Sequence, residues 1–171
     1  GGHGVLVHRG GLDPATGVQT AISNGAYFGS PQGIEQRGGG AMVVADPAGL
    51  LEVAPSTGQQ RRFSDALEPN FALQVVFDGA GDALVLETDG ITRVPYVYGG
   101  IAPGVPLLTL PVAGAISFFV GDSLARETSG HLLVTGFGPL GDGIFRVGAT
   151  GTPITKVTPS FSGDTWQDLA I

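Results

Sequence analysis

Apolar and polar positions along this chain alternate in short runs that are separated by glycine-marked turns. Such runs predict β-strands, because successive side chains of a strand point to opposite faces. One pattern, an apolar strand followed by a turn and a second short strand, recurs along the sequence. A strand-based repeat of about 40 to 50 residues is typical of bladed architectures. The copies occupy residues 12–23, 53–64, 99–110 and 147–158, with Gly17, Gly58, Gly104 and Gly151 in their turns.

The remaining apolar runs extend each complete repeat to four strands. The third strands place Glu52, Arg93 and Arg146 at one equivalent position. Their alternation predicts one face in a core and the other toward water. First strands are expected at 31–36, 73–78, 116–121 and 167–171, second strands at 41–46, 83–90 and 131–136, and third strands at 50–53, 91–94 and 144–147.

The best-formed repeat, residues 31–64, contains P-x-G-I, G-x-x-M-V-V-A-D and L-L-E-V-x-P-S-T-G in that order. This order of motifs resembles that of the NHL and streptogramin-lyase-like families of β-propellers, and residues 12–23 resemble these families as well. The resemblance implies a propeller fold. It also implies possible chemistry in a central funnel, where the lyases use paired histidines and a glutamate near a metal and the lactone-hydrolase relatives use a Glu, Asn and Asp set. The chain departs from both patterns, because His3, His8 and His131 fall in different repeats and the only asparagines are Asn24 and Asn70.

We therefore expect an all-β chain that forms a β-propeller of about four four-stranded blades. Three blades are expected at 30–70, 71–114 and 115–164. Residues 1–29 supply later strands of a blade and residues 165–171 a first strand, so the two ends are complementary. They would share a closing blade within one chain or between two protomers, which would remove unpaired edges. An excerpt of a longer propeller, an all-β sandwich and a parallel β-solenoid are the alternatives.

Composition agrees with a folded all-β domain. The 30 Gly and 12 Pro among 171 residues lie between the apolar runs, as turn residues do. A hydrophobic content of 42% is sufficient for a core. The length is that of a single domain.

Charge and cysteine content exclude several classes of partner. A net charge of −7 with Lys156 as the single lysine argues against nucleic acid and anionic membranes. The uncharged stretch 94–121 contains four prolines that would break a helix, so no membrane span is expected. Without cysteine there are no disulfides or thiolate metal sites. The composition is that of secreted bacterial β-proteins, which favours an extracellular, periplasmic or cell-surface location.

No catalytic motif is present. The histidines do not form H-E-x-x-H, and no serine lies in G-x-S-x-G. The segment D-G-A-G-D at 78–82 offers carboxylates but lacks the other ligands of a calcium loop, so we interpret it as a tight turn. No catalytic residue and no cofactor are therefore predicted. A divalent cation such as calcium or magnesium is the alternative.

Ligands of propellers meet the face where blade-joining loops and loops between second and third strands gather. An acidic rim there would hold a cationic, sugar or other small-molecule ligand. The competing interpretation is a solvated acidic surface. The candidate binding residues are Asn24, Tyr27, Asn70, Asp164 and Trp166 on blade-joining loops, together with Asp65 and Glu68, and Asp46, Glu87, Asp89 and Asp142 on the other set.

The sequence thus predicts a non-enzymatic propeller scaffold. It would bind a ligand or another protein, or self-associate by blade completion. The alternative is a metal-dependent propeller lyase or lactonase with its site in the central funnel, completed by residues of a second chain.

Overall fold

The computed structural model describes residues 15–16, 22–23, 27–64, 71–97, 100–109, 123–137 and 141–158. These residues form three four-stranded antiparallel sheets, each built from strands consecutive in sequence. We call the sheets blade 1 (β1–β4), blade 2 (β5–β8) and blade 3 (β9–β12). The strands are β1 Gly33–Gln36, β2 Met42–Asp46, β3 Gly49–Val53, β4 Gln60–Arg62, β5 Ala72–Phe77, β6 Ala83–Glu87, β7 Gly90–Val94, β8 Val105–Thr109, β9 Leu124–Arg126, β10 Leu132–Gly136, β11 Gly143–Val147 and β12 Ile154–Lys156.

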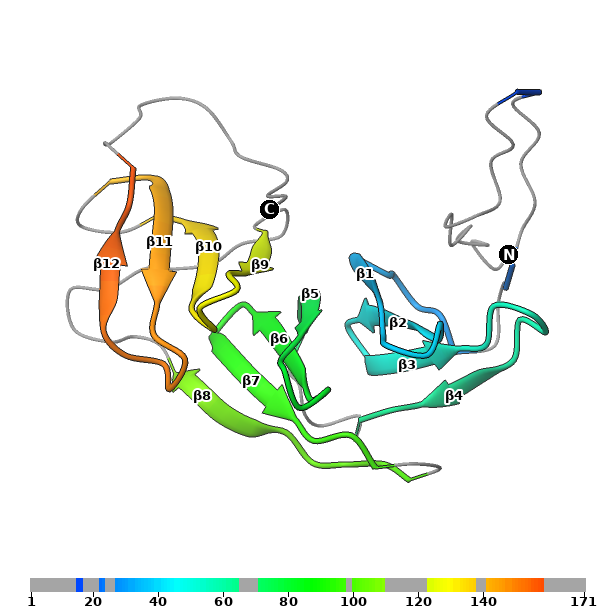
Figure 1. Ribbon diagram of the computed structural model, residues 1–171. Coiled ribbons are helices and arrows are strands. Elements are labelled where there is room, and N and C mark those ends of the chain that lie inside the picture. Colours follow the sequence, from blue (N-terminus) through cyan, green and yellow to red (C-terminus); the bar gives the residue numbers. More distant parts are fainter. Residues whose placement is uncertain are drawn as a thin grey trace.

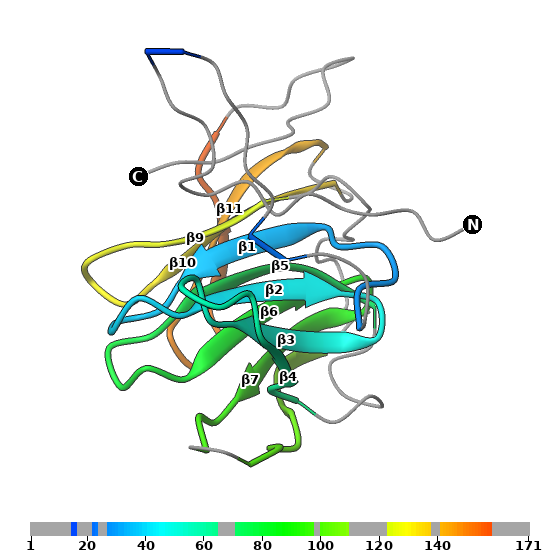
Figure 2. The same cartoon turned by 90° about the vertical axis from the view of Figure 1, so that its right-hand side faces the viewer.

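The three blades stand side by side in an arc (Figure 1). The first strands β1, β5 and β9 lie on its inner side, and β5 contacts both the β1–β2 pair and β9. The fourth strands β4, β8 and β12 lie on the outer side. Figure 2 looks toward blade 1, in which β1 to β4 follow one another in sequence order.

Two hydrophobic seams join the blades. Between blades 1 and 2, Val43 and Leu50 pack with Val75 and Val85. Between blades 2 and 3, a second cluster combines Leu84, Leu86 and Ile91 with Leu132, Val134 and Phe145. Both faces of blade 2 are therefore covered, and every residue of β6 is buried. The expectation that third strands turn one face to water is wrong for β3 and β7, because blades pack face to face.

A third cluster covers the other side of blade 1. Here Met42, Val44, Leu51 and Val53 are buried, with Ile22, Phe28 and Ile34 packed against them. Ile22 and Phe28 precede the first described strand, so residues on both sides of 24–26 contact this face. The Oδ2 of Asp46 accepts hydrogen bonds from the amides of Gly29 (2.8 Å) and Ser30 (2.9 Å), which fixes the chain just ahead of β1.

Because consecutive strands of each blade are antiparallel, the turns lie at two opposite ends of the strands. The first-to-second turns, residues 37–41, 78–82 and 127–131, share one end with the third-to-fourth turns. The second-to-third turns, residues 47–48, 88–89 and 137–142, lie at the other end of the strands. The turns at 37–41, 78–82 and 127–131 have the same hydrogen bonds, for example Asp78 N to Asp82 O (3.0 Å) and Glu127 N to His131 O (2.9 Å).

The first strand of blade 3 corrects a prediction. It lies at Leu124–Arg126 rather than at 116–121, which falls outside the described residues. The register explains the difference, since Leu132 of β10 pairs with Arg126 and leaves Glu127–His131 as the turn. The predicted strands at 116–121 and 131–136 left residues 122–130, and with them β9, between them. The predicted closing blade, residues 1–29 with 165–171, lies almost entirely outside the described residues.

Candidate functional site

The predicted acidic rim is largely structural. Asp46 is fully buried, and besides Gly29 and Ser30 it accepts the amide of Ala48 (3.0 Å). Glu87 stands at the same place in β6 and is buried, where its Oε2 accepts the hydroxyl of Thr92 (2.9 Å). Both buried carboxylates therefore have hydrogen-bond partners within their own blade.

The other described candidates lie apart. Asp89 is exposed in the β6–β7 turn, and Asp142 is half-buried before β11. Tyr27 is exposed, with the guanidinium of Arg62 5.6 Å from its ring centre and its amide donating to Gln60 Oε1 (3.1 Å). Asn24, Asp65, Glu68, Asn70, Asp164 and Trp166 lie outside the described residues.

The D-G-A-G-D turn uses its carboxylates internally. Asp78 Oδ1 accepts the amides of Ala80 (2.8 Å) and Asp82 (3.0 Å), and its Oδ2 lies 3.3 Å from Arg93 Nη2. Asp82 Oδ1 accepts the amide of Tyr96 (3.1 Å). These contacts agree with the tight-turn interpretation. Within the described ranges, no group of three or more His, Cys, Asp or Glu side chains is placed to hold a metal ion.

Blade 3 differs from blades 1 and 2 in how well one of its sides is covered. In each blade we call the side directed toward the next blade along the chain the forward face. The forward face of blade 3 is the side that points away from blade 2. Sheet register defines its equivalent positions: Val43, Leu84 and Leu133 are opposite the third-strand residues Glu52, Arg93 and Arg146. In the same way, Leu50 and Ile91 correspond to Ile144.

A third position lies on the outer edge of the forward face. Phe63 and Val157 each donate a backbone hydrogen bond to the equivalent carbonyls of Leu50 (2.9 Å) and Ile144 (2.8 Å), and Leu108 pairs with Ile91. Phe63 is 1% exposed and Leu108 5%, whereas Val157 is 45% exposed. Leu133 and Ile144 are likewise half-buried, while all their counterparts are buried. The forward face of blade 3 is therefore an incompletely covered apolar surface.

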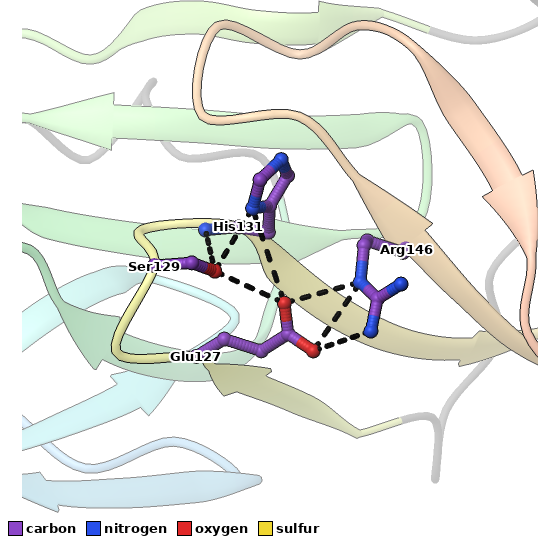
Figure 3. Close-up of polar contacts among 4 residues, drawn as sticks. All are labelled: Glu127, Ser129, His131 and Arg146. Carbon is purple, nitrogen blue, oxygen red and sulfur yellow. Dashed lines mark hydrogen bonds and ion pairs between the residues drawn. The ribbon is translucent and has the colours of Figure 1, made fainter.

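A polar cluster borders this face at the 127–131 turn (Figure 3). Arg146 Nη2 donates to Glu127 Oε1 at 2.7 Å, and its Nε lies 3.1 Å from Oε2. This pairing with Arg146 lowers the pKa of Glu127 below its usual 4.5, with a smaller contribution from the Ser129 hydroxyl, and raises the pKa of Arg146. The same carboxylate thus orders the turn and holds Arg146 at the edge of the forward face.

Ser129 and His131 complete the cluster but do not form a catalytic triad. The Ser129 hydroxyl donates to Glu127 Oε2 (3.2 Å) and lies 2.9 Å from Nδ1 of His131. In a triad the acid and the nucleophile bind opposite ring nitrogens. Here both lie on the Nδ1 side, so the arrangement supports a turn rather than serine activation.

The sequence did not identify Leu133, Ile144 and Val157 as functional candidates. Each belongs to a correctly predicted strand or to the end of a repeat, and the repeat alignment already gave their equivalence with buried residues. The sequence does not show which blade lacks a neighbour on its forward face among the described residues, because no sequence motif indicates how blades are arranged.

Together, the repeated four-stranded sheets, the inner first strands and the face-to-face seams define a β-propeller, as the sequence predicted. No helix in the described part of the chain has the length and apolar character needed to cross a bilayer.

Comparison with solved structures supports this fold. The chain is similar to virginiamycin B lyase from Staphylococcus aureus, with a TM-score of 0.58 and 13% sequence identity over 85% of this chain and 46% of the lyase. A protein of unknown function from Bacteroides caccae has a TM-score of 0.51 and 16% identity, covering 69% of this chain and 45% of that protein. The extracellular domain of a protein described as a hybrid two-component system of B. thetaiotaomicron has a TM-score of 0.51 and 16% identity, covering 87% and 18%.

The chain spans less than half the length of each of these structures. No protein-family model and no curated protein matches the sequence. The similarity therefore concerns the fold.

Proposed function

We propose that the chain is a non-catalytic propeller scaffold that assembles by accepting a further propeller blade on the forward face of blade 3. The observation that carries the proposal is that Val157 is exposed and Leu133 and Ile144 are only half-buried, at positions that are buried in both preceding blades. The equivalent apolar surfaces of blades 1 and 2 each pack against a neighbouring blade, so we interpret this surface as a docking surface for another blade.

The two existing seams indicate what such a face accepts. At the seam of blades 1 and 2, the first strand β5 packs on the β1–β2 pair. At the outer edge, the amide of Ala102 donates to the carbonyl of Phe63 (3.4 Å), and Ser64 forms a parallel bridge with Ala102. A partner blade would bring an apolar first strand and a third-to-fourth turn to the same places on blade 3.

Polar contacts at the same seam add specificity. Tyr96 of blade 2 lies under the guanidinium of Arg37, 3.3 Å from its ring centre, and its hydroxyl accepts from Arg61 (3.2 Å). Arg61 in turn pairs with Glu52. On blade 3 the equivalent border carries Glu127 and Arg146, so the partner blade would meet an already neutralised ion pair there.

Solution mass tests the proposal. We expect light scattering across a dilution series to show an assembly of the wild-type chain that Leu133→Asp abolishes, since a carboxylate would be buried without a partner. Val97→Asp is the matched control, because Val97 is 47% exposed on a turn of blade 2 away from the forward face. A wild-type chain that stays monomeric at all concentrations, or an assembly indifferent to Leu133→Asp, contradicts the proposal.

Location outside the bacterial cell is part of the same proposal. The extracellular domain among the similar structures supports it, together with the acidic, lysine-poor composition. Small-molecule or sugar binding on the face that carries Asp89 and Asp142 remains compatible with an assembled ring. Its test is saturable binding by the assembled species only.

A metal-dependent propeller lyase is the second candidate, favoured by the similarity in fold to virginiamycin B lyase. A catalytically inactive variant of that lyase was solved with quinupristin. The active ring would need blades beyond those described. Two results together would favour the lyase. The assembled protein would bind a divalent cation stoichiometrically, and quinupristin, monitored by mass spectrometry, would disappear only when the metal is present. Neither property is expected of a scaffold.

A further inference from the structure

A glycine in the third-to-fourth turn of a blade presses against the outer strand of the blade before it. Gly151 of blade 3 has a φ of 89°, and a Cβ added there would collide with the backbone oxygen of Leu107 in β8. Gly58 of blade 1 has a φ of 68°, and its Cβ would collide with the backbone oxygen of Ile22. The close approach and the left-handed conformation both require glycine.

This equivalence assigns a structural role to Ile22. It meets blade 1 as Leu107 of the outer strand β8 meets blade 3. Its side chain also packs with Phe28 on the backward side of blade 1, against Met42 and Leu51. Ser23 strengthens the contact, because its hydroxyl donates to the carbonyl of Gly58 (2.7 Å). Ile22 therefore stands where the outer strand of a blade preceding blade 1 would stand.

The sequence repeats the same turn at the head of the chain. Thr-Gly occurs at residues 16–17 as it does at 57–58 and 150–151. The head turn should then press on the outer strand of whichever blade comes before it. The outer strand with no such neighbour among the described residues is β12, next to the exposed Val157.

We propose that the turn at Thr16 of a second copy of this chain docks on the outer edge of blade 3, against β12 and Val157. This inference rests on the proposed function, for which it names the partner and the docking element. One composite blade then satisfies both needs, because it precedes blade 1 of one copy and follows blade 3 of the other. Such a contact is head-to-tail, and contacts of this kind form a ring when the rotation from copy to copy closes.

Cross-linking tests the inference cleanly, since the chain has no cysteine. Thr16→Cys and Val157→Cys are prepared as separate single variants and treated with a short bis-maleimide reagent, alone and mixed. We expect a covalent dimer only in the mixture. A double variant, Ile22→Cys with Thr57→Cys, calibrates the reagent, because Ile22 lies against the neighbouring Gly58 within one chain.

The outcomes separate the two proposals. If the Thr16→Cys and Val157→Cys changes cross-link only when combined in one chain, each chain closes on itself and the inference is wrong. If wild-type protein assembles and Leu133→Asp disrupts it, yet the mixture gives no cross-link, the partner is another surface and only the inference fails. If wild-type protein is monomeric in light scattering and no mixture cross-links, the proposed function fails as well.

Discussion

Phe63 and Val157 occupy the same position in their respective blades, each with its amide bonded to the first apolar residue of the third strand, but Phe63 is 1% exposed and Val157 45%. The difference arises from the neighbouring blade and not from the strand itself. Phe63 lies 5.5 Å from the ring centre of Tyr96, which blade 2 contributes. Val157 has the same backbone environment and lacks such a cover among the described residues.

The first prediction compares Ile91 and Ile144, which are equivalent on the two forward faces. Ile91→Ala should lower the free energy of unfolding by about 2–4 kcal/mol, because it leaves a cavity in a closed seam. Ile144→Ala should cost about 1 kcal/mol or less below the assembly concentration, because the side chain is half-buried. Chemical denaturation of both variants measures the difference. Equal losses would show that the forward face of blade 3 is already covered in the single chain.

The second prediction concerns the pH dependence of the Glu127–Arg146 pair. Because the pKa of Glu127 is lowered in the folded state, the pair stabilises the fold above the unfolded value of 4.5, and that contribution disappears as pH falls through the folded pKa. Arg146→Met should therefore raise the pKa of Glu127 measured by NMR. It should also lower the melting temperature at pH 7 more than at pH 3. Arg62→Met, which leaves Glu127 untouched, should do neither.

The third prediction concerns Asp46. Asp46→Ala should reduce the free energy of unfolding by about 1–3 kcal/mol, because the amides of Gly29, Ser30 and Ala48 lose their acceptor. Asp89→Asn, at an exposed turn position, should change it by no more than about 0.5 kcal/mol. Hydrogen exchange should show faster exchange of the Gly29 and Ser30 amides in Asp46→Ala. Unchanged protection of these amides would mean that Asp46 does not anchor the segment.

The fourth prediction concerns the seam glycines. Gly151→Ala should destabilise the fold by at least about 1 kcal/mol, because the added Cβ meets the carbonyl of Leu107 and the left-handed φ disfavours alanine. Gly38→Ala is the matched control, since nothing lies within 4 Å of its Cβ position and its φ is not left-handed. Thermal unfolding of the two variants should separate them. Equal melting temperatures would contradict the close approach of blades 2 and 3.

Most strands of the fold could be predicted from local pattern. Runs such as 41–46 and 50–53 are bounded by turn residues and recur at a spacing of about 40 to 50 residues, so each was recognisable without its neighbours. The first strand of blade 3 was misplaced because Leu124–Arg126 is short and polar at its end. Its strand conformation comes from pairing with β10 across the 127–131 turn and from contact with β5, which is distant in sequence.

The candidate binding residues were harder to predict. Asp46 and Glu87 were identified by charge and by their position at the end of a second strand, and that position was correct. Both side chains are buried and accept hydrogen bonds from hydroxyl or amide donors. Charge in a sequence does not report the direction of a side chain.

The sequence by itself determined the repeat, the four-stranded unit, the equivalence of positions such as Leu50, Ile91 and Ile144, and the glycines of the turns. These follow from local hydrophobic period and backbone conformation, which each residue carries with it. Only the tertiary structure decided which equivalent positions are buried, because burial depends on whether another blade stands in front of them. For that reason Leu50 and Ile91 are core residues, whereas Ile144 lies on an open face.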